Sequence, residues 1–141
     1  MTGNAMWQFG WSDDLMIGDA AIDAQHRTFF VEADQIRAAL TSEEPKDRIL
    51  DFCRAFLANL RVHFHDEEQL MLRIGFAAIK DHQLEHSRLL AEPEAACTEI
   101  ENTGCVIDCL LTTRALSDAL VEHIATRDAE IGIVLRSRTP T

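Results

Sequence analysis

The stretch HFHDEEQLM, residues 63–71, places two histidines and three acidic residues inside a segment whose flanks are typical of an apolar helix. His63 and Glu67 are four residues apart, so both lie on one face of that helix. Phe56 and Leu60 precede His63 at intervals of four and three residues, so they lie on the same face of the helix. The pattern predicts that His63 and Glu67 point into a protein core, where ionisable side chains need partners.

The rest of the chain shows the same helical spacing of apolar residues. Turn signals divide it into four segments, at residues 19–41, 45–75, 78–101 and 105–135. Pro93 is expected to kink or interrupt the third segment. Because no long stretch alternates with period two, a sheet is not expected. The sequence predicts an all-α fold, an antiparallel up-down-up-down four-helix bundle with an N-terminal arm.

A chain of 141 residues is expected to form a single domain. The predicted parts are an N-terminal arm (1–18), the bundle (19–135) and a tail (136–141). Trp7 and Trp11 lie in the arm, where we expect them to cap the bundle.

Composition and charge exclude several classes of function. The formal net charge of -11 would repel nucleic acids and anionic membranes, so neither is an expected partner. No signal peptide or membrane-spanning apolar segment is visible, and we expect a cytoplasmic protein. The four cysteines have no CxxC spacing, which favours reduced, buried or half-buried thiols over a zinc site or disulfides. A protein partner cannot be named from the sequence.

Histidines recur on the inner faces of all four predicted helices. Five of the six are predicted to face inward, and only His65 is expected to be solvated, with Asp66 and Glu68 nearby. Asp128, five residues after His123, lies about 140° from it around a regular helix, so the two should flank one central site. Five buried imidazoles require a common explanation, and a bound metal supplies one. The inward-facing histidines are His26, His63, His82, His86 and His123.

The number of candidate ligands indicates two metal ions. Five imidazoles and two carboxylates, Glu67 and Asp128, are too many for one tetrahedral zinc. Two octahedral ions offer roughly twelve positions. Two bridging carboxylates, five imidazoles and a bridging oxo or hydroxo group leave one position open, where a small molecule such as O2 could bind. Iron is the imidazole-binding metal that best suits this task.

Four motifs together resemble the hemerythrin family, in particular its single-domain bacterial members. They are IDAQH at 22–26, HFHDEEQLM at 63–71, HQLEH at 82–86 and HIATRD at 123–128, within a resemblance that covers roughly residues 11–131. The resemblance implies a centre of two non-haem Fe ions with a bridging oxo or hydroxo group. One iron would be held by His82, His86 and His123, the other by His26 and His63, with Glu67 and Asp128 bridging them.

The resemblance also implies a dry pocket beside the second iron, which keeps the open position for O2. Its expected lining is Phe29, Phe64, Met71 and Leu120. The sequence departs from the family at Ala119, where a tryptophan is frequent. A larger or wetter pocket at Ala119 would favour oxidation of the centre or entry of bigger ligands.

The leading hypothesis is therefore a non-enzymatic O2-binding protein that serves storage, delivery or sensing. The first alternative is a diiron enzyme that acts on peroxide, nitric oxide or ferrous iron. No general acid or base stands out beyond the ligands, which weighs against it. The second alternative is an O2 or redox sensor module that signals through a partner.

Overall fold

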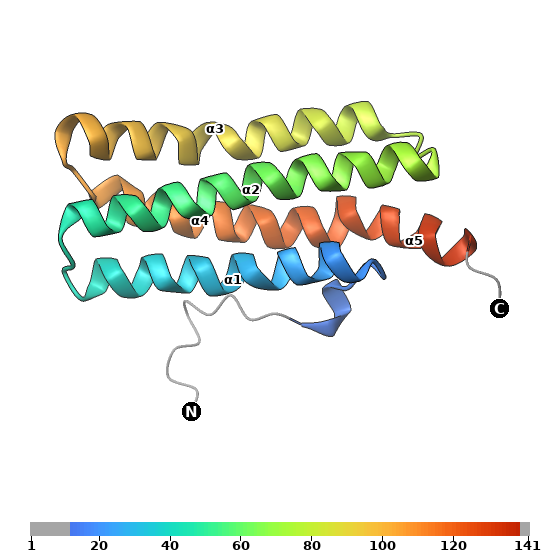
Figure 1. The fold of residues 1–141 in the computed structure, drawn as a ribbon, viewed down its shortest axis with the longest axis horizontal. Helices are drawn as coiled ribbons and strands as arrows, with labels where there is room; N and C mark the ends of the chain where they lie inside the picture. Colours follow the sequence, from blue (N-terminus) through green and yellow to red (C-terminus); the bar gives the residue numbers. More distant parts are fainter. Residues whose placement is uncertain (1–11, 139–141) are drawn as a thin grey trace.

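Four long helices lie side by side and alternate in direction, as Figure 1 shows for the computed structural model. The structure describes residues 12–138. Within them the helical elements are η2 (Asp13–Leu15), α1 (Ala20–Thr41), α2 (Lys46–Ile74), α3 (Ile79–Thr103), α4 (Ile107–His123), η3 (Ile124–Asp128) and α5 (Ala129–Arg138). That part of the chain contains no β-strand. The predicted all-α four-helix bundle is confirmed.

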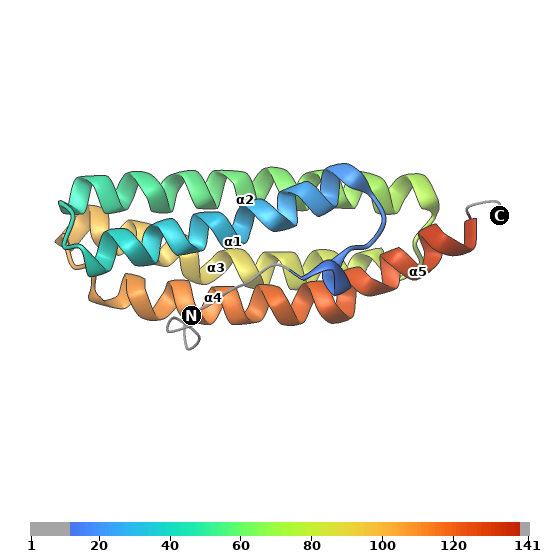
Figure 2. The ribbon, with the colours of Figure 1, turned by 90° about the horizontal axis from the view of Figure 1, so that it is seen from below.

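The helices form a ring in which each contacts the next. Packing joins α1 to α2, α2 to α3, α3 to α4, and α4 back to α1. Figure 2, turned by 90° from Figure 1, shows α2 along the top and α4 along the bottom, with α1 and α3 between them. The space enclosed by the four helices is the core, and a side chain that points into it meets residues from the other helices.

Local signals in the sequence set where the helices begin and end. Asp19 caps α1, because its Oδ2 accepts a hydrogen bond from the backbone N–H of Ile22. Gly75 ends α2 with a positive φ of 68°, a conformation that glycine adopts without steric penalty. Gly104 ends α3 in the same way. The last helical residue, Thr103, lies two residues beyond the predicted end at 101.

The core consists of two apolar clusters along the bundle. The first includes Phe29, Phe64 and Leu120, and the second includes Ile22, Leu70, Met71 and Ile131. Along α1, along α2 and along the run from α4 through η3 to α5, the candidate ligands fall between members of the two clusters. The bundle therefore contains one polar layer between two apolar ones.

Pro93 does not interrupt α3, which runs without a break from Ile79 to Thr103. The expected interruption is thus absent. Proline removes one intrahelical hydrogen bond, but Pro93 is buried and its ring packs in the core, which offsets part of that loss. The tertiary packing therefore keeps α3 in one piece.

The single-domain organisation is a prediction that the structure covers only in part. Residues 1–11 of the predicted arm, which include Trp7 and Trp11, and residues 139–141 lie outside the described part of the chain. All four cysteines are free, three of them buried and Cys105 half-buried, as expected. Between residues 12 and 138, no helix combines the length and apolar character needed to cross a membrane.

Candidate metal centre

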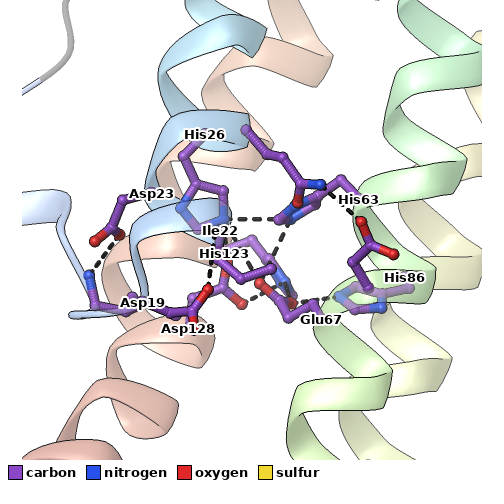
Figure 3. A network of polar contacts seen from close by, with 12 residues as sticks. Asp19, Ile22, Asp23, His26, His63, Glu67, His86, His123 and Asp128 are labelled. Carbon is purple, nitrogen blue, oxygen red and sulfur yellow. Dashed lines mark hydrogen bonds and ion pairs between the residues drawn. The ribbon is translucent and has the colours of Figure 1, made fainter.

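Seven ionisable side chains from α1, α2, α3, α4 and η3 meet in the polar layer. Each is at most 3% exposed to solvent. Figure 3 shows how several of them point toward one another from different helices. The structure thus brings together every residue that the sequence predicted as a metal ligand: His26, His63, Glu67, His82, His86, His123 and Asp128.

These side chains form two overlapping groups, each with donor atoms within 4.8 Å of one another. One group contains three histidines and the other contains two. Glu67 and Asp128 belong to both. The first group adds His82, His86 and His123, and the second adds His26 and His63.

The carboxylate of Glu67 faces both groups at once. Its Oε1 lies 2.9 Å from His82 Nε2 and 3.0 Å from His86 Nε2. Its Oε2 lies 3.4 Å from His63 Nε2 and 3.6 Å from His26 Nε2. Each oxygen therefore turns to a different set of histidines, which is the orientation of a carboxylate that bridges two ions.

Asp128 is oriented in the same way. Its Oδ1 lies 2.9 Å from His82 Nε2 and 3.0 Å from His123 Nε2, and its Oδ2 lies 3.1 Å from His26 Nε2. Each of the two carboxylates thus presents one oxygen to the group with three histidines and the other oxygen to the group with two.

A π-helical turn explains how His123 and Asp128 reach the same site. Residues Ile124–Asp128 form η3, a π-helix, between α4 and α5. A π-helix pairs residues five apart in the chain, so His123 and Asp128 lie on one face. The regular helix assumed from the sequence would have separated them by about 140°. The expectation that they flank the site from two sides is wrong, although both reach it.

Several buried atoms of the centre have no hydrogen-bond partner among the described residues. They include Glu67 Oε2, both carboxylate oxygens of Asp128 and both ring nitrogens of His123. His123 Nε2 is near Asp128 Oδ1, but the pair makes no well-directed hydrogen bond. Unpaired buried polar atoms are unfavourable, and a cation bound in the centre would satisfy the carboxylate oxygens and His123 Nε2. The donor set of imidazoles and carboxylates therefore fits a transition metal.

The pKa values of these side chains in the metal-free protein also indicate a site that needs positive charge. Burial lowers the pKa of His26 and His82, but contacts with Asp128 and Glu67 outweigh it and raise both pKa values to about 9. Burial and the nearby charge of Glu67 raise the pKa of Asp128. Its contacts with histidines outweigh both effects and lower the pKa to about 2. Two buried carboxylates thus require nearby positive charge, which protonated imidazoles or metal ions supply.

Two side chains outside the ligand set orient the imidazoles. Gln25 Oε1 accepts a hydrogen bond from His63 Nδ1 at 2.7 Å, while Gln25 Nε2 donates to Asp66. Glu68 Oε2 accepts a hydrogen bond from His86 Nδ1 at 2.8 Å. Both contacts place the ring proton on Nδ1 and leave Nε2 free to bind a metal.

Sequence reasoning missed both roles. It noted Asp66 and Glu68 only as residues near the solvated His65, and it assigned no role to Gln25. His65 is exposed as predicted. The available signal in the sequence was that each residue is next to a ligand, since Gln25 precedes His26 and Glu68 follows Glu67. Only the packed helices show which imidazole ring each side chain reaches.

Aromatic side chains cover the centre on one side. The Phe29 ring meets the His63 ring edge to face, with centroids 4.9 Å apart. Phe64 stacks on His86 with centroids 3.9 Å apart and an angle of 10° between the rings. Both phenylalanines are buried, as are two further residues predicted to line the ligand pocket, Met71 and Leu120.

Ala119 is half-buried and lies at a surface pocket of about 90 Å³ between α3 and α4. The pocket is also lined by Arg88, Glu92 and Thr112, and none of its lining residues is a candidate ligand. A wider ligand pocket at Ala119 therefore stays a prediction.

Comparison with known proteins agrees with this geometry. Residues 18–132 match the family described as Hemerythrin HHE cation binding domain. A bacteriohemerythrin of Ralstonia nicotianae is 30% identical over 133 residues, which cover 92% of this chain and 90% of the relative. One of Clostridium acetobutylicum is 29% identical over 90 residues, which cover 62% and 70%. No solved structure matched the chain.

Proposed function

The chain belongs to the hemerythrin family, and on this premise we propose that it holds two non-haem iron ions and binds O2 reversibly without catalysing a reaction. The observation that carries the proposal is the shared pair of carboxylates, each with one oxygen toward either group of histidines. Under it, His82, His86 and His123 would hold one iron, and His26 and His63 the other. Glu67 and Asp128 would bridge the two, together with an oxo or hydroxo group.

The unequal division of imidazoles supports an open position on one iron. Three histidines serve one group and two serve the other, while the carboxylates are shared equally. Bound iron would supply the redox chemistry that holds O2. The free coordination position would face the side of His26 and His63, where Phe29 packs against both rings.

The residues around the centre suit binding better than turnover. Buried apolar side chains on that side exclude water, which disfavours irreversible oxidation. Among the side chains whose burial the structure describes, the only buried carboxylate or imidazole outside the centre is Asp23, which accepts hydrogen bonds from the backbone N–H groups of Ile17 and Gly18. Among these described side chains, no other buried group of that kind is left to act as a general acid or base.

Visible spectroscopy of the reduced, iron-loaded protein tests the proposal. We expect a colourless protein that develops a charge-transfer band on exposure to O2 and loses the band when O2 is removed. A protein that air converts at once to a ferric form from which no O2 is released would contradict reversible binding. That result would direct attention to peroxide and nitric oxide as substrates.

A further inference from the structure

A pocket of about 260 Å³ lies in the groove between α1 and α2, directly outside the histidine pair. Its lining residues come from the first half of α1 and the middle of α2: Ala24, Gln25, Thr28, Phe29, Asn59 and Val62. Val62 is 56% exposed and Phe29 is 2% exposed, so the pocket extends from solvent to a buried side chain.

Two of these lining residues contact His63 directly. Gln25 accepts the hydrogen bond from His63 Nδ1, and the edge-to-face contact of Phe29 is made with the same ring. The Phe29 ring also lies 6.3 Å from the His26 ring. One layer of side chains, Gln25 and Phe29, therefore separates the pocket from the two-histidine side of the centre.

The chemistry of the pocket suits a small neutral molecule. None of its lining side chains is charged. The pocket beside Ala119, by contrast, is smaller, and its lining includes the charged residues Arg88 and Glu92. A neutral diatomic molecule gives up less hydration than an ion when it enters the uncharged α1–α2 pocket. The charged side chains of the other pocket would not attract it.

We propose that O2 reaches the iron through the α1–α2 pocket, with Phe29 as the movable barrier between pocket and centre. The inference rests on the proposed function. Motion of the Phe29 side chain would open the path, because Phe29 is the buried end of the pocket and contacts both histidine rings. Gln25 would stay in place through its bonds to His63 and Asp66, which hold it at both ends.

The path is tested by filling each pocket in turn in the full, iron-loaded chain. Val62→Trp places a large side chain in the α1–α2 pocket, and Ala115→Trp does the same in the pocket between α3 and α4. Neither residue contacts the centre, so both variants should keep the wild-type iron content. The rates of O2 association and dissociation are then measured by rapid mixing.

We expect Val62→Trp to slow both rates by about fivefold or more with an unchanged Kd, because a blocked path alters rates and not the equilibrium. Ala115→Trp should leave both rates within about twofold of wild type. Slower O2 binding in Ala115→Trp with wild-type rates in Val62→Trp would overturn the proposal. So would a changed Kd in Val62→Trp at unchanged association rate.

The proposed function and the path can fail separately. If the wild-type protein holds iron and does not bind O2, the proposed function fails. The same two variants are then compared for nitric oxide, a neutral diatomic of similar size. Slowing in Val62→Trp alone would still support the path, and equal rates in both variants would reject it.

Discussion

His26 Nε2, near the start of α1, lies 3.1 Å from Asp128 Oδ2, at the end of the π-helical turn η3. This contact joins α1 to the turn η3, which follows α4, through the buried centre. Both side chains are fully buried. The centre therefore links segments from the two ends of the described chain. A change at its residues should alter both metal binding and the stability of the fold.

Replacement of Asp128 tests the bridging role. Asp128→Asn keeps the size of the side chain but removes one negative charge and one metal-binding oxygen. We expect the variant to hold fewer than two iron ions per chain, because each ion would lose a ligand or the charge that attracts it. Iron content after anaerobic loading and desalting checks this. Glu122→Gln, on the exposed side of the same helix, is the control and should retain wild-type iron. Full iron content in Asp128→Asn would contradict the bridge.

Loss of the Gln25 amide should weaken iron binding without removing a ligand. Gln25→Ala leaves His63 Nδ1 without its acceptor, so the ring is no longer held with Nε2 toward the centre. We expect a loss of roughly tenfold to a hundredfold in iron affinity, measured by competition with a chelator. Gln35→Ala, at an exposed position of α1, should bind iron like wild type. Equal affinities in both variants would show that Gln25 does not orient the ring.

The metal-free protein should lose stability as the pH rises from about 6.5 to 9. His26 and His82 have pKa values of about 9 in the folded protein, against 6.5 in an unfolded chain. A raised pKa contributes stability that is complete below 6.5 and is lost as the pH passes 9. The pKa of His63 is lowered by burial, so His63 is neutral in both states above 6.5 and adds nothing in this range.

Urea unfolding in the presence of a chelator, at pH 6.5 and at pH 9, measures this effect. The raised pKa of His26 alone corresponds to a decrease on the order of 3 kcal/mol in the free energy of unfolding. His26→Gln should show a smaller decrease than wild type, while His65→Gln, at an exposed position, should behave like wild type. A stability that is flat or rises over this range would contradict the charge balance of the centre.

Phe29 should protect bound O2 from water. Phe29→Leu shortens the side chain that covers His63 and leaves space at the buried end of the α1–α2 pocket. We expect faster conversion of the O2-bound protein to the ferric form, because water reaches the centre more often. The decay of the charge-transfer band at constant O2 measures the rate.

Phe56→Leu is the matched control for this experiment, since Phe56 is also buried and packs against Phe29 from α2. Both variants should lose a similar amount of stability, about 1 kcal/mol, from the space left in the core. Only Phe29→Leu should speed the decay. Equal decay in the two variants would mean that general loosening of the core, and not the cover over His63, controls oxidation.

Much of this site could be predicted because the information is local. Helical spacing placed His26, His63 and Glu67 on inner faces, and Asp19 and Gly75 marked helix ends by the backbone chemistry that they favour. The π-turn at Ile124–Asp128 was missed because five-residue pairing is not visible in a pattern interpreted with 3.6 residues per turn.

Other features depend on how the helices pack against one another. The continuity of α3 through Pro93 depends on packing in the core, which outweighs the local preference of proline. The partners of His63 and His86 depend on the relative position of α1, α2 and α3 along the bundle axis. A single sequence gives each helix its inner face but not this axial position. The pocket between α1 and α2 was missed for the same reason.

The number of iron ions bound by one chain tests the central claim most directly. Native mass spectrometry of the anaerobically loaded protein reports it for intact chains. A centre with Glu67 and Asp128 shared between two groups of histidines predicts a mass increase that corresponds to two iron ions per chain. A saturating increase of one iron ion per chain would contradict the shared centre, and with it the proposal that a second iron keeps a position open for O2.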